Sequence, residues 1–161
     1  MLYLIAAISD DNVIGVEGKL PWRLKNELRW FRMNTLHGTV IMGRKTWDSL
    51  PRKPLPNRLN IIITRGPLPS ANTNIIWSNS LEDAIATAYR RTKRVYVIGG
   101  SDIFAMALQH PCRLLVTRVH CTVNPINNAR VLLLPKRKTL IWRSEIQCEN
   151  ELNYHFELYI T

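Results

Sequence analysis

Glu27 is the only acidic residue in a strongly basic stretch, LPWRLKNELRWF at residues 20–31. Read as a helix, this stretch places Leu24, Leu28 and Phe31 at the i, i+4 and i+7 spacing of a stripe that faces the core. Glu27 takes the i+3 position of the same stripe. The spacing therefore predicts an inward-facing carboxylate, although burying an unpaired charge costs several kcal/mol.

An inward carboxylate needs a partner, and no lysine or arginine lies within the stripe. A ligand with two adjacent N–H donors would match both carboxylate oxygens, as a guanidinium does. The alternative is a surface glutamate near a helix N-terminus, where negative charge is favourable. The spacing of Glu27 leaves both interpretations open.

Two strand-to-helix junctions carry glycine. In VIMGRKTWDSL, residues 40–50, a strand ends at Gly43 and is followed by Arg44, Lys45 and Thr46. Free N–H groups and two cations at the start of a helix favour an anion site over a surface turn with incidental cations, and arginine suits a terminal phosphate.

The second junction is VYVIGGSDIF, residues 95–104, in which Gly99 and Gly100 open a helix. It lacks the complete G-x-G-x-x-G fingerprint, so a tight turn without a ligand is the alternative. Two such junctions in one sheet favour a dinucleotide bound across the carboxyl ends of its strands.

Apolar strands alternate with amphipathic helices along the chain. We expect strands at 2–8, 39–43, 59–64, 73–78, 94–98, 113–123, 140–148 and 154–161, and helices at 23–34, 44–50, 81–90 (capped by Ser80, with Asp83 completing an approximate capping box) and 102–109. This order predicts an α/β fold in three layers, with a mixed, mostly parallel central sheet, flanking helices and a C-terminal antiparallel hairpin. Without a linker or repeat, residues 1–161 are expected to form a single domain.

The composition limits the function classes. With 161 residues, 46% of them hydrophobic, the chain can enclose a core and a pocket, and no apolar run is long enough to span a bilayer. The net charge of +10 favours anionic ligands, and the basic run at 90–94 is interpreted as a solvated helix end rather than a nucleic-acid site.

The start of the chain has the pattern of a strand rather than a leader. Three cysteines without Cys-x-x-Cys spacing favour reduced thiols in a cytoplasmic protein, and no metal site is predicted.

These motifs together resemble a dihydrofolate reductase of the bacterial monomeric, chromosomal type, over nearly the whole chain. The resemblance rests on LIAAIS at 4–9, VIG at 13–15, LPW at 20–22, Glu27 with LRWF after it, VIMGRKTWDSL, PLPNR at 54–58, NIIIT at 60–64 and VIGGSDIF. It implies reduction of 7,8-dihydrofolate to 5,6,7,8-tetrahydrofolate with NADPH by a cytoplasmic monomer, and antifolates as inhibitors.

The resemblance also implies residue roles. Glu27 would bind N3 and the 2-amino group of the pterin and support protonation at N5 while hydride passes to C6. Trp22, Leu20 in the mobile loop, and Thr117 would complete the catalytic set. The implied substrate-binding residues are Ile5, Ala7, Glu27, Leu28, Phe31, Arg32, Leu50, Arg52, Leu55, Arg58 (for the α-carboxylate), Ile98 and Thr117. The implied cofactor-binding residues are Ala7, Ile14, Gly15, Gly43, Arg44, Lys45, Thr46, Thr64, Arg65, Gly99 and Gly100 (the family's cis pair), Ser101, Asp102, Ile103 and Phe104.

The chain departs from the family pattern in three places. Phe104 stands where the family usually has tyrosine, and Asp102 puts a negative charge near the expected pyrophosphate. The stretch VNPINNARVLLLP at 123–135 lacks the family's Gly-Asp pair, so closure of the loop over the nicotinamide is expected to behave differently.

Two alternatives stay open at this stage. One is a reductase of the same fold that acts on another pterin or on a pyrimidine intermediate of riboflavin synthesis, which LPW, Glu27 and Arg58 disfavour. The other is a nucleic-acid-binding protein that has kept the fold and lost catalysis. The net charge favours it, but the intact pocket chemistry argues against it.

Overall fold

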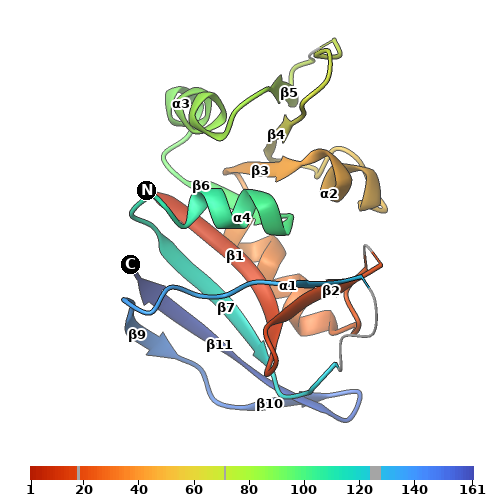
Figure 1. Ribbon diagram of the computed structural model, residues 1–161, viewed down its shortest axis with the longest axis vertical. Coiled ribbons are helices and arrows are strands. Elements are labelled where there is room, and N and C mark those ends of the chain that lie inside the picture. Colours follow the sequence, from red (N-terminus) through yellow and green to blue (C-terminus); the bar gives the residue numbers. More distant parts are fainter. Residues whose placement is uncertain (18, 71, 124–127) are drawn as a thin grey trace.

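A mixed sheet of nine strands forms the centre of the molecule (Figure 1). The computed structural model describes residues 1–17, 19–70, 72–123 and 128–161. Six strands are parallel to one another: β1 (Leu2–Ser9), β3 (Thr39–Gly43), β4 (Leu59–Ile63), β5 (Ile75–Ser78), β6 (Val95–Gly99) and β7 (Arg113–Val119). With β10 (Gln147–Glu149) and β11 (Leu152–Ile160), the strand order is β10-β11-β7-β1-β6-β3-β4-β5, which confirms the predicted α/β class.

Helices cover both faces of this sheet. They are α1 (Lys25–Thr35), α2 (Arg44–Ser49), α3 (Leu81–Arg91) and α4 (Ser101–Ala107). Figure 1 shows α1 and α4 on opposite sides of β1 and β7. The packing agrees, since α3 and α4 share one apolar cluster with Leu4 and Ile41, whereas α1 and α2 share another with Ile5 and Val40. Of the described helices, none is long and apolar enough to cross a membrane.

The parallel strands were predictable because both of their faces are buried. Seven of the eight residues of β1, LYLIAAIS, are buried, as are four of the five of β3, TVIMG. A strand covered on both sides has an almost continuous apolar sequence, which is easily recognised. The predicted bounds of β3 agree with the structure, and those of the other parallel strands differ by one or two residues, except at β7, which ends four residues early.

The C-terminal antiparallel hairpin is present but more complicated than predicted. The stretch 140–148 forms two strands, β9 (Thr139–Arg143) and β10 (Gln147–Glu149), and both pair with β11 (Leu152–Ile160). A register shift at Leu158–Tyr159 interrupts the ladder, and Ser144 accepts a hydrogen bond from the amide of Phe156 through its side chain. The amide of Ser144 also donates to the carbonyl of Phe156, so this pair extends the β9–β11 ladder by one residue beyond Arg143.

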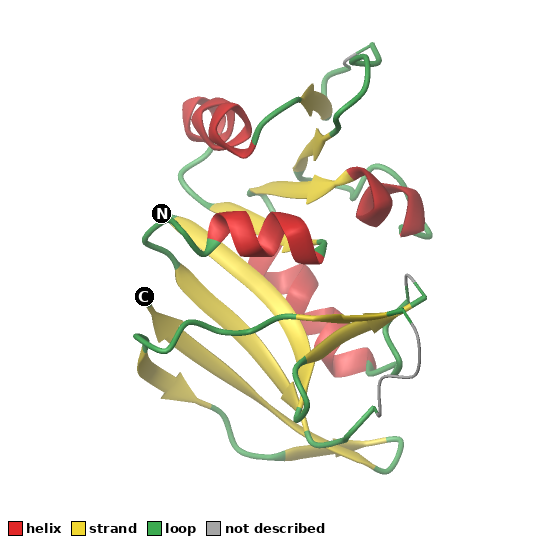
Figure 2. Cartoon of the chain, viewed as in Figure 1, coloured by secondary structure: helices red, strands yellow, loops and turns green. Residues whose placement is uncertain are grey.

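A second, two-stranded sheet was not predicted. It consists of β2 (Val13–Val16) and β8 (Ala129–Val131), which pair with each other and lie to the right of β1 in Figure 2. Its strands are too short to show a period of two in the sequence. The atypical stretch 123–135 is thus attached through β8 to β2, while its residues 124–127 lie outside the described part of the chain.

Ser80 caps α3 as predicted, but the capping box is only half formed. The Ser80 hydroxyl accepts from the amide of Asp83 at 3.1 Å, whereas the amide of Ser80 donates to the Ser78 hydroxyl at 3.4 Å. The basic run continues from the end of α3, and Arg90, Arg91, Lys93 and Arg94 are exposed, as a solvated helix end requires.

Replacing Ser80 with alanine should lower the free energy of unfolding by about 1 kcal/mol, because an amide in the first turn of α3 loses its acceptor. Urea denaturation measures this difference, and Ser70→Ala in an exposed loop serves as the matched control. Equal stability of the two variants would show that the cap contributes nothing.

Candidate functional site

Glu27 is buried, with 7% of its surface exposed, in the first turn of α1. Burial raises the pKa of its carboxyl to about 7, against a smaller lowering by a hydrogen bond with the Thr117 side chain. Among the described residues, no ion pair involves Glu27. The inward orientation is therefore confirmed, and the surface-glutamate interpretation is wrong.

The partner of Glu27 is supplied by the centre of the sheet. Thr117 lies on β7, opposite Ala7 on β1 and opposite Phe156 on β11, and only 1% of its surface is exposed. Ala7 and Phe156 belong to an apolar cluster that includes Trp22 and also contains Leu24, Val119 and Tyr154. Three adjacent strands thus present one hydroxyl to the carboxylate within an otherwise apolar surface.

Trp22 lies in the same cluster, and 8% of its surface is exposed. Its buried indole N–H has no protein partner in the described part of the chain. The loop before α1 also lines a hollow of about 310 Å³, bounded by Pro21, Trp22, Cys121, Thr122, Val123 and Leu152. The segment 121–123, which leads into the atypical stretch, therefore faces the loop that carries Trp22 and the exposed Leu20.

Apolar side chains from α1, from the segment after α2 and from strands β1 and β6 form a second cluster. Phe31, Leu50, Leu55 and Ile98 are half-buried and pack on one cluster together with the buried Ile5. The prediction that Leu28 faces the core is wrong, because 48% of its surface is exposed. Only Glu27 and Thr35 of α1 are buried, and the half-buried Trp30 and Phe31 between them pack on the core clusters.

Arg58 is buried and is held by two hydrogen bonds. Its Nε donates to the carbonyl of Pro56 at 3.0 Å, and its Nη1 donates to the Thr35 hydroxyl at 3.0 Å. Two causes lower the pKa of the Arg58 guanidinium: burial has the larger effect, and the positive charge of Arg32 has the smaller one. Arg32 and Arg52 themselves are exposed.

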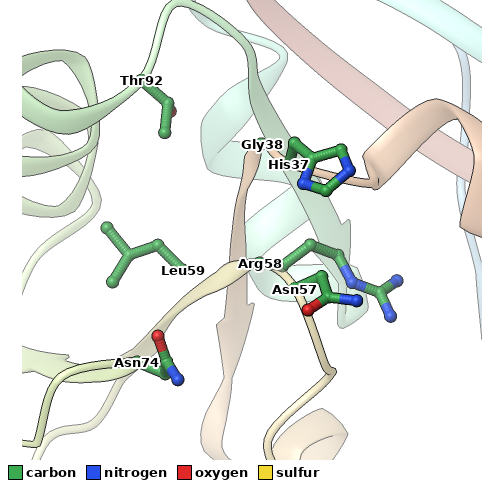
Figure 3. A pocket seen from close by; sticks show the side chains of 7 residues that line it. All are labelled: His37, Gly38, Asn57, Arg58, Leu59, Asn74 and Thr92. Carbon is green, nitrogen blue, oxygen red and sulfur yellow. The ribbon is translucent and has the colours of Figure 1, made fainter.

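A polar hollow of about 340 Å³ also borders Arg58. Its lining comprises His37, Gly38, Asn57, Arg58, Leu59, Asn74 and Thr92 (Figure 3). Gly38 precedes β3 and Leu59 begins β4, so the hollow lies at the amino ends of these strands. In Figure 3 the guanidinium extends away from Leu59 and Thr92.

The two glycine junctions meet at the carboxyl ends of β3 and β6. Met42 is paired with Gly99 across these strands. A Cβ at Gly43 would lie 3.8 Å from the amide nitrogen of Gly100 and 3.1 Å from Cγ1 of Ile103. Gly99 has a φ of +128°, and the Gly99–Gly100 peptide bond is cis. Glycine at these positions lets the two strand ends and the first turn of α4 pack closely together.

The neighbouring strand end adds cations and hydroxyls. Gly43 and Ile63 are paired in parallel register, so Arg44 and Arg65 follow adjacent strand ends. Lys45, Thr46 and Thr64 lie in the same two segments; Lys45 and both arginines are exposed. This edge of the sheet therefore presents three cations beside the glycine junction.

Arg44 has two contacts that the sequence analysis missed. Its Nε pairs with the carboxylate of Asp48 at 3.1 Å, and its guanidinium lies 5.1 Å from the ring centre of Trp77. The i, i+4 spacing of Arg44 and Asp48 was a recognisable signal. Trp77 comes from β5, and no local pattern could have revealed it.

The remaining predicted cofactor residues surround the junction. Phe104 is buried, and a Cβ at Gly99 would lie 3.5 Å from its Cε2 atom. Ser101 begins α4, Asp102 follows it and is exposed, and Ile103 is buried. Ile14 and Gly15 are half-buried on β2.

The fold and site define a class: an α/β protein with a buried carboxylate that forms no ion pair among the described residues, and a separate cationic edge of the sheet. Comparison with known proteins is more specific. The dihydrofolate reductase family model matches residues 1–159. The chain is 36% identical over 159 residues to a dihydrofolate reductase of Buchnera aphidicola from Acyrthosiphon pisum, covering 96% of each chain.

Other relatives agree. A dihydrofolate reductase of Haemophilus influenzae is 39% identical over 116 residues, covering 72% of this chain and 70% of that protein. The solved structure of a dihydrofolate reductase from Enterococcus faecalis, complexed with NADP(H) and RAB-propyl, superposes with a TM-score of 0.87 at 29% identity, covering 99% of this chain and 95% of that one. The chain belongs to the dihydrofolate reductase family, which confirms the resemblance and the predicted enzyme class.

The raised pKa of Glu27 should make stability depend on pH. Its value of about 7 in the folded state exceeds the ordinary 4.5, so the folded state holds this proton more tightly than the unfolded state. The wild-type protein then loses stability as the pH rises through this interval, by up to about 3 kcal/mol. We expect Glu27→Gln to remove the loss and to gain stability relative to wild type by about that amount between about pH 4 and about pH 8.

Urea denaturation of both proteins across this interval measures the effect. Glu82→Gln, on the exposed side of α3, is the matched control and should follow the wild type at every pH. A constant difference between wild type and Glu27→Gln would contradict the assigned pKa.

Proposed function

We propose that the chain reduces 7,8-dihydrofolate to 5,6,7,8-tetrahydrofolate with NADPH, and that Glu27 binds the pterin and supports protonation of N5. The observation that carries the proposal is the buried Glu27 carboxylate, whose neighbours are a threonine hydroxyl and apolar side chains rather than a cation. Family membership supports the reaction, and the burial of Glu27 supports its role.

A pterin edge with a ring N–H beside an amino group supplies the two donors that a carboxylate accepts together. Thr117 holds one part of the Glu27 carboxyl and leaves the rest for the ligand. Since the pKa of Glu27 is about 7, the carboxyl carries a proton in much of the free protein near neutral pH. A site poised in this way can bias a weakly basic imine nitrogen towards protonation.

Trp22 and Leu20 complete this part of the site. The unpartnered indole N–H of Trp22 is suited to hold an ordered water beside the pterin, through which a proton reaches N5. Leu20 lies exposed in the adjoining loop and can pack over the ring when the ligand is present. Excluding bulk water in this way strengthens each polar contact inside the site.

The substrate's benzoyl and glutamate parts fit the residues beyond Glu27. The half-buried Phe31, Leu50, Leu55 and Ile98 provide an apolar surface for the benzoyl ring, with Leu28 exposed at its edge. Arg58, fixed by two hydrogen bonds, is preorganised to pair with the α-carboxylate. Arg32 and Arg52 add positive charge nearby.

The residues at the carboxyl ends of β3, β4 and β6 fit NADPH. The glycine junction admits close backbone approach, and Arg44, Lys45 and Arg65 provide charge for the adenosine 2′-phosphate and pyrophosphate, with Thr46, Thr64 and Ser101 as hydroxyl donors. NADPH supplies the hydride when bound. Ala7, Ile14, Gly15 and Phe104 border the nicotinamide in this proposal, and the missing tyrosine hydroxyl at 104 is expected to slow hydride transfer.

The proposal also includes a single domain over residues 1–161, a monomer in the cytoplasm and inhibition by antifolates. The family match over residues 1–159 supports the single domain, and three free cysteines fit the cytoplasm. Nucleic acid is not part of it, since the cationic residues named above are assigned to two anionic ligands.

The decisive experiment follows NADPH oxidation in the presence of dihydrofolate. Glu27→Ala and Glu27→Gln should lower kcat/KM for dihydrofolate by about 10²-fold or more, because pterin binding and proton supply are lost together. Binding of NADPH, measured by fluorescence, should persist in both variants. Unchanged turnover would refute the role of Glu27.

A wild type that turns over another pterin or a pyrimidine instead, or binds RNA without oxidising NADPH, would support an alternative function.

Arg44→Ala tests the cofactor assignment. Losing a charge-assisted contact to the 2′-phosphate should raise KM for NADPH by about 10-fold to 100-fold, while KM for NADH should stay unchanged. Steady-state kinetics with both cofactors provide the internal control. If both KM values rise together, Arg44 acts on a part that the two cofactors share.

A further inference from the structure

The N-terminus of α1 is capped by a residue from the other end of the chain. Its own N-cap residue, Leu24, has no side chain that can accept a hydrogen bond. Instead, the two carboxylate oxygens of Glu149 accept from the amide of Lys25 at 2.5 Å and from the amide of Asn26 at 3.1 Å. These are the first two amides of α1, and Glu27 is the next residue.

Glu149 reaches α1 from the tip of a tight hairpin. It is the last residue of β10 and pairs with Leu152 of β11. The two residues between them, Asn150 and Glu151, have φ angles of 51° and 63°. Two positive φ angles in a two-residue loop are typical of a type I′ turn, the tightest connection between antiparallel strands. Glu149 therefore stands next to a two-residue turn between two paired strands, β10 and β11.

A second bond attaches the same hairpin to the residue before Leu24. The side-chain amide of Asn150 donates to the carbonyl of Arg23 at 3.0 Å. The hairpin therefore contacts the chain on both sides of Leu24, between the Trp22 loop and the first turn of α1. The two amide donors hold the pKa of Glu149 below its ordinary value, as expected for a carboxylate that stays ionised at a helix N-terminus.

We propose that Glu149 is a positioning residue for the reaction: it orders the first turn of α1 and so holds the carboxyl of Glu27 in its buried place. This inference rests on the proposed function of Glu27. In this inference Glu149 acts through the backbone of α1 and not on the substrate, because its carboxylate accepts hydrogen bonds from the amides of Lys25 and Asn26. Uncapped first turns fray, and a frayed turn would let water reach Glu27.

Loss of the cap should therefore change the properties of Glu27 as well as stability. In Glu149→Ala, the carboxyl of Glu27 should become more hydrated, and its pKa should fall from about 7 towards its ordinary value. The pH profile of kcat/KM for dihydrofolate should then shift to lower pH, with a loss of roughly tenfold near neutral pH. KM for NADPH should stay unchanged, because its site lies at other strands.

The experiment compares Glu149→Ala, Glu149→Gln and the matched control Glu151→Gln. Glu149→Gln keeps one carbonyl oxygen as an acceptor and should rescue part of the effect. Glu151→Gln removes the same charge two residues away, on an exposed side chain, and should behave as wild type. Steady-state kinetics over pH, together with NMR titration of the selectively labelled Glu27 carboxyl in the free protein, provide the readouts.

The outcomes separate this inference from the proposed function. If Glu149→Ala melts at a lower temperature but leaves the Glu27 titration and the pH profile as in wild type, Glu149 is only a structural cap and the inference is wrong. If the wild type does not reduce dihydrofolate, the proposed function fails. The NMR titration still decides whether Glu149 controls the burial of Glu27.

Discussion

The constraint on which this structure depends is the burial of one carboxylate without a cation. A charged group removed from water must be neutralised or paired, and among the described residues Glu27 forms no ion pair but a hydrogen bond with the side chain of Thr117. The free protein therefore holds a carboxyl whose charge is costly. A ligand that donates two hydrogen bonds relieves that cost, so the same burial that raises the pKa also favours the ligand.

The sheet creates this environment by bringing distant segments into register. Thr117 lies in β7 between Ala7 of β1 and Phe156 of β11, and only 1% of its surface is exposed. The hydroxyl that contacts Glu27 is therefore buried within the sheet. The helix that carries Glu27 is fixed at its first turn by Glu149, more than a hundred residues away in the sequence. A precise site thus depends on long-range pairing rather than on local chain preferences.

Positive charge is arranged by the same geometry. Parallel strands end at one edge, and the segments after β3 and β4 place Arg44 and Arg65 beside the glycine junction. Arg58 instead lies deep and is held by Pro56 and Thr35. One chain thereby offers an exposed cationic edge and a buried guanidinium held by two hydrogen bonds.

The sequence by itself determined the parallel strands, the four helices, the Ser80 cap, the two glycine junctions and the unusual place of Glu27, because all of these follow from hydrophobic period and local chemistry. The tertiary structure decided the rest. It alone showed the β2–β8 pair, the division of 140–148 into two strands and the exposure of Leu28. It alone placed Trp77 under Arg44 and Glu149 at the start of α1. These contacts join residues far apart along the chain, and a local sequence pattern cannot specify which distant segments will meet when strands pair.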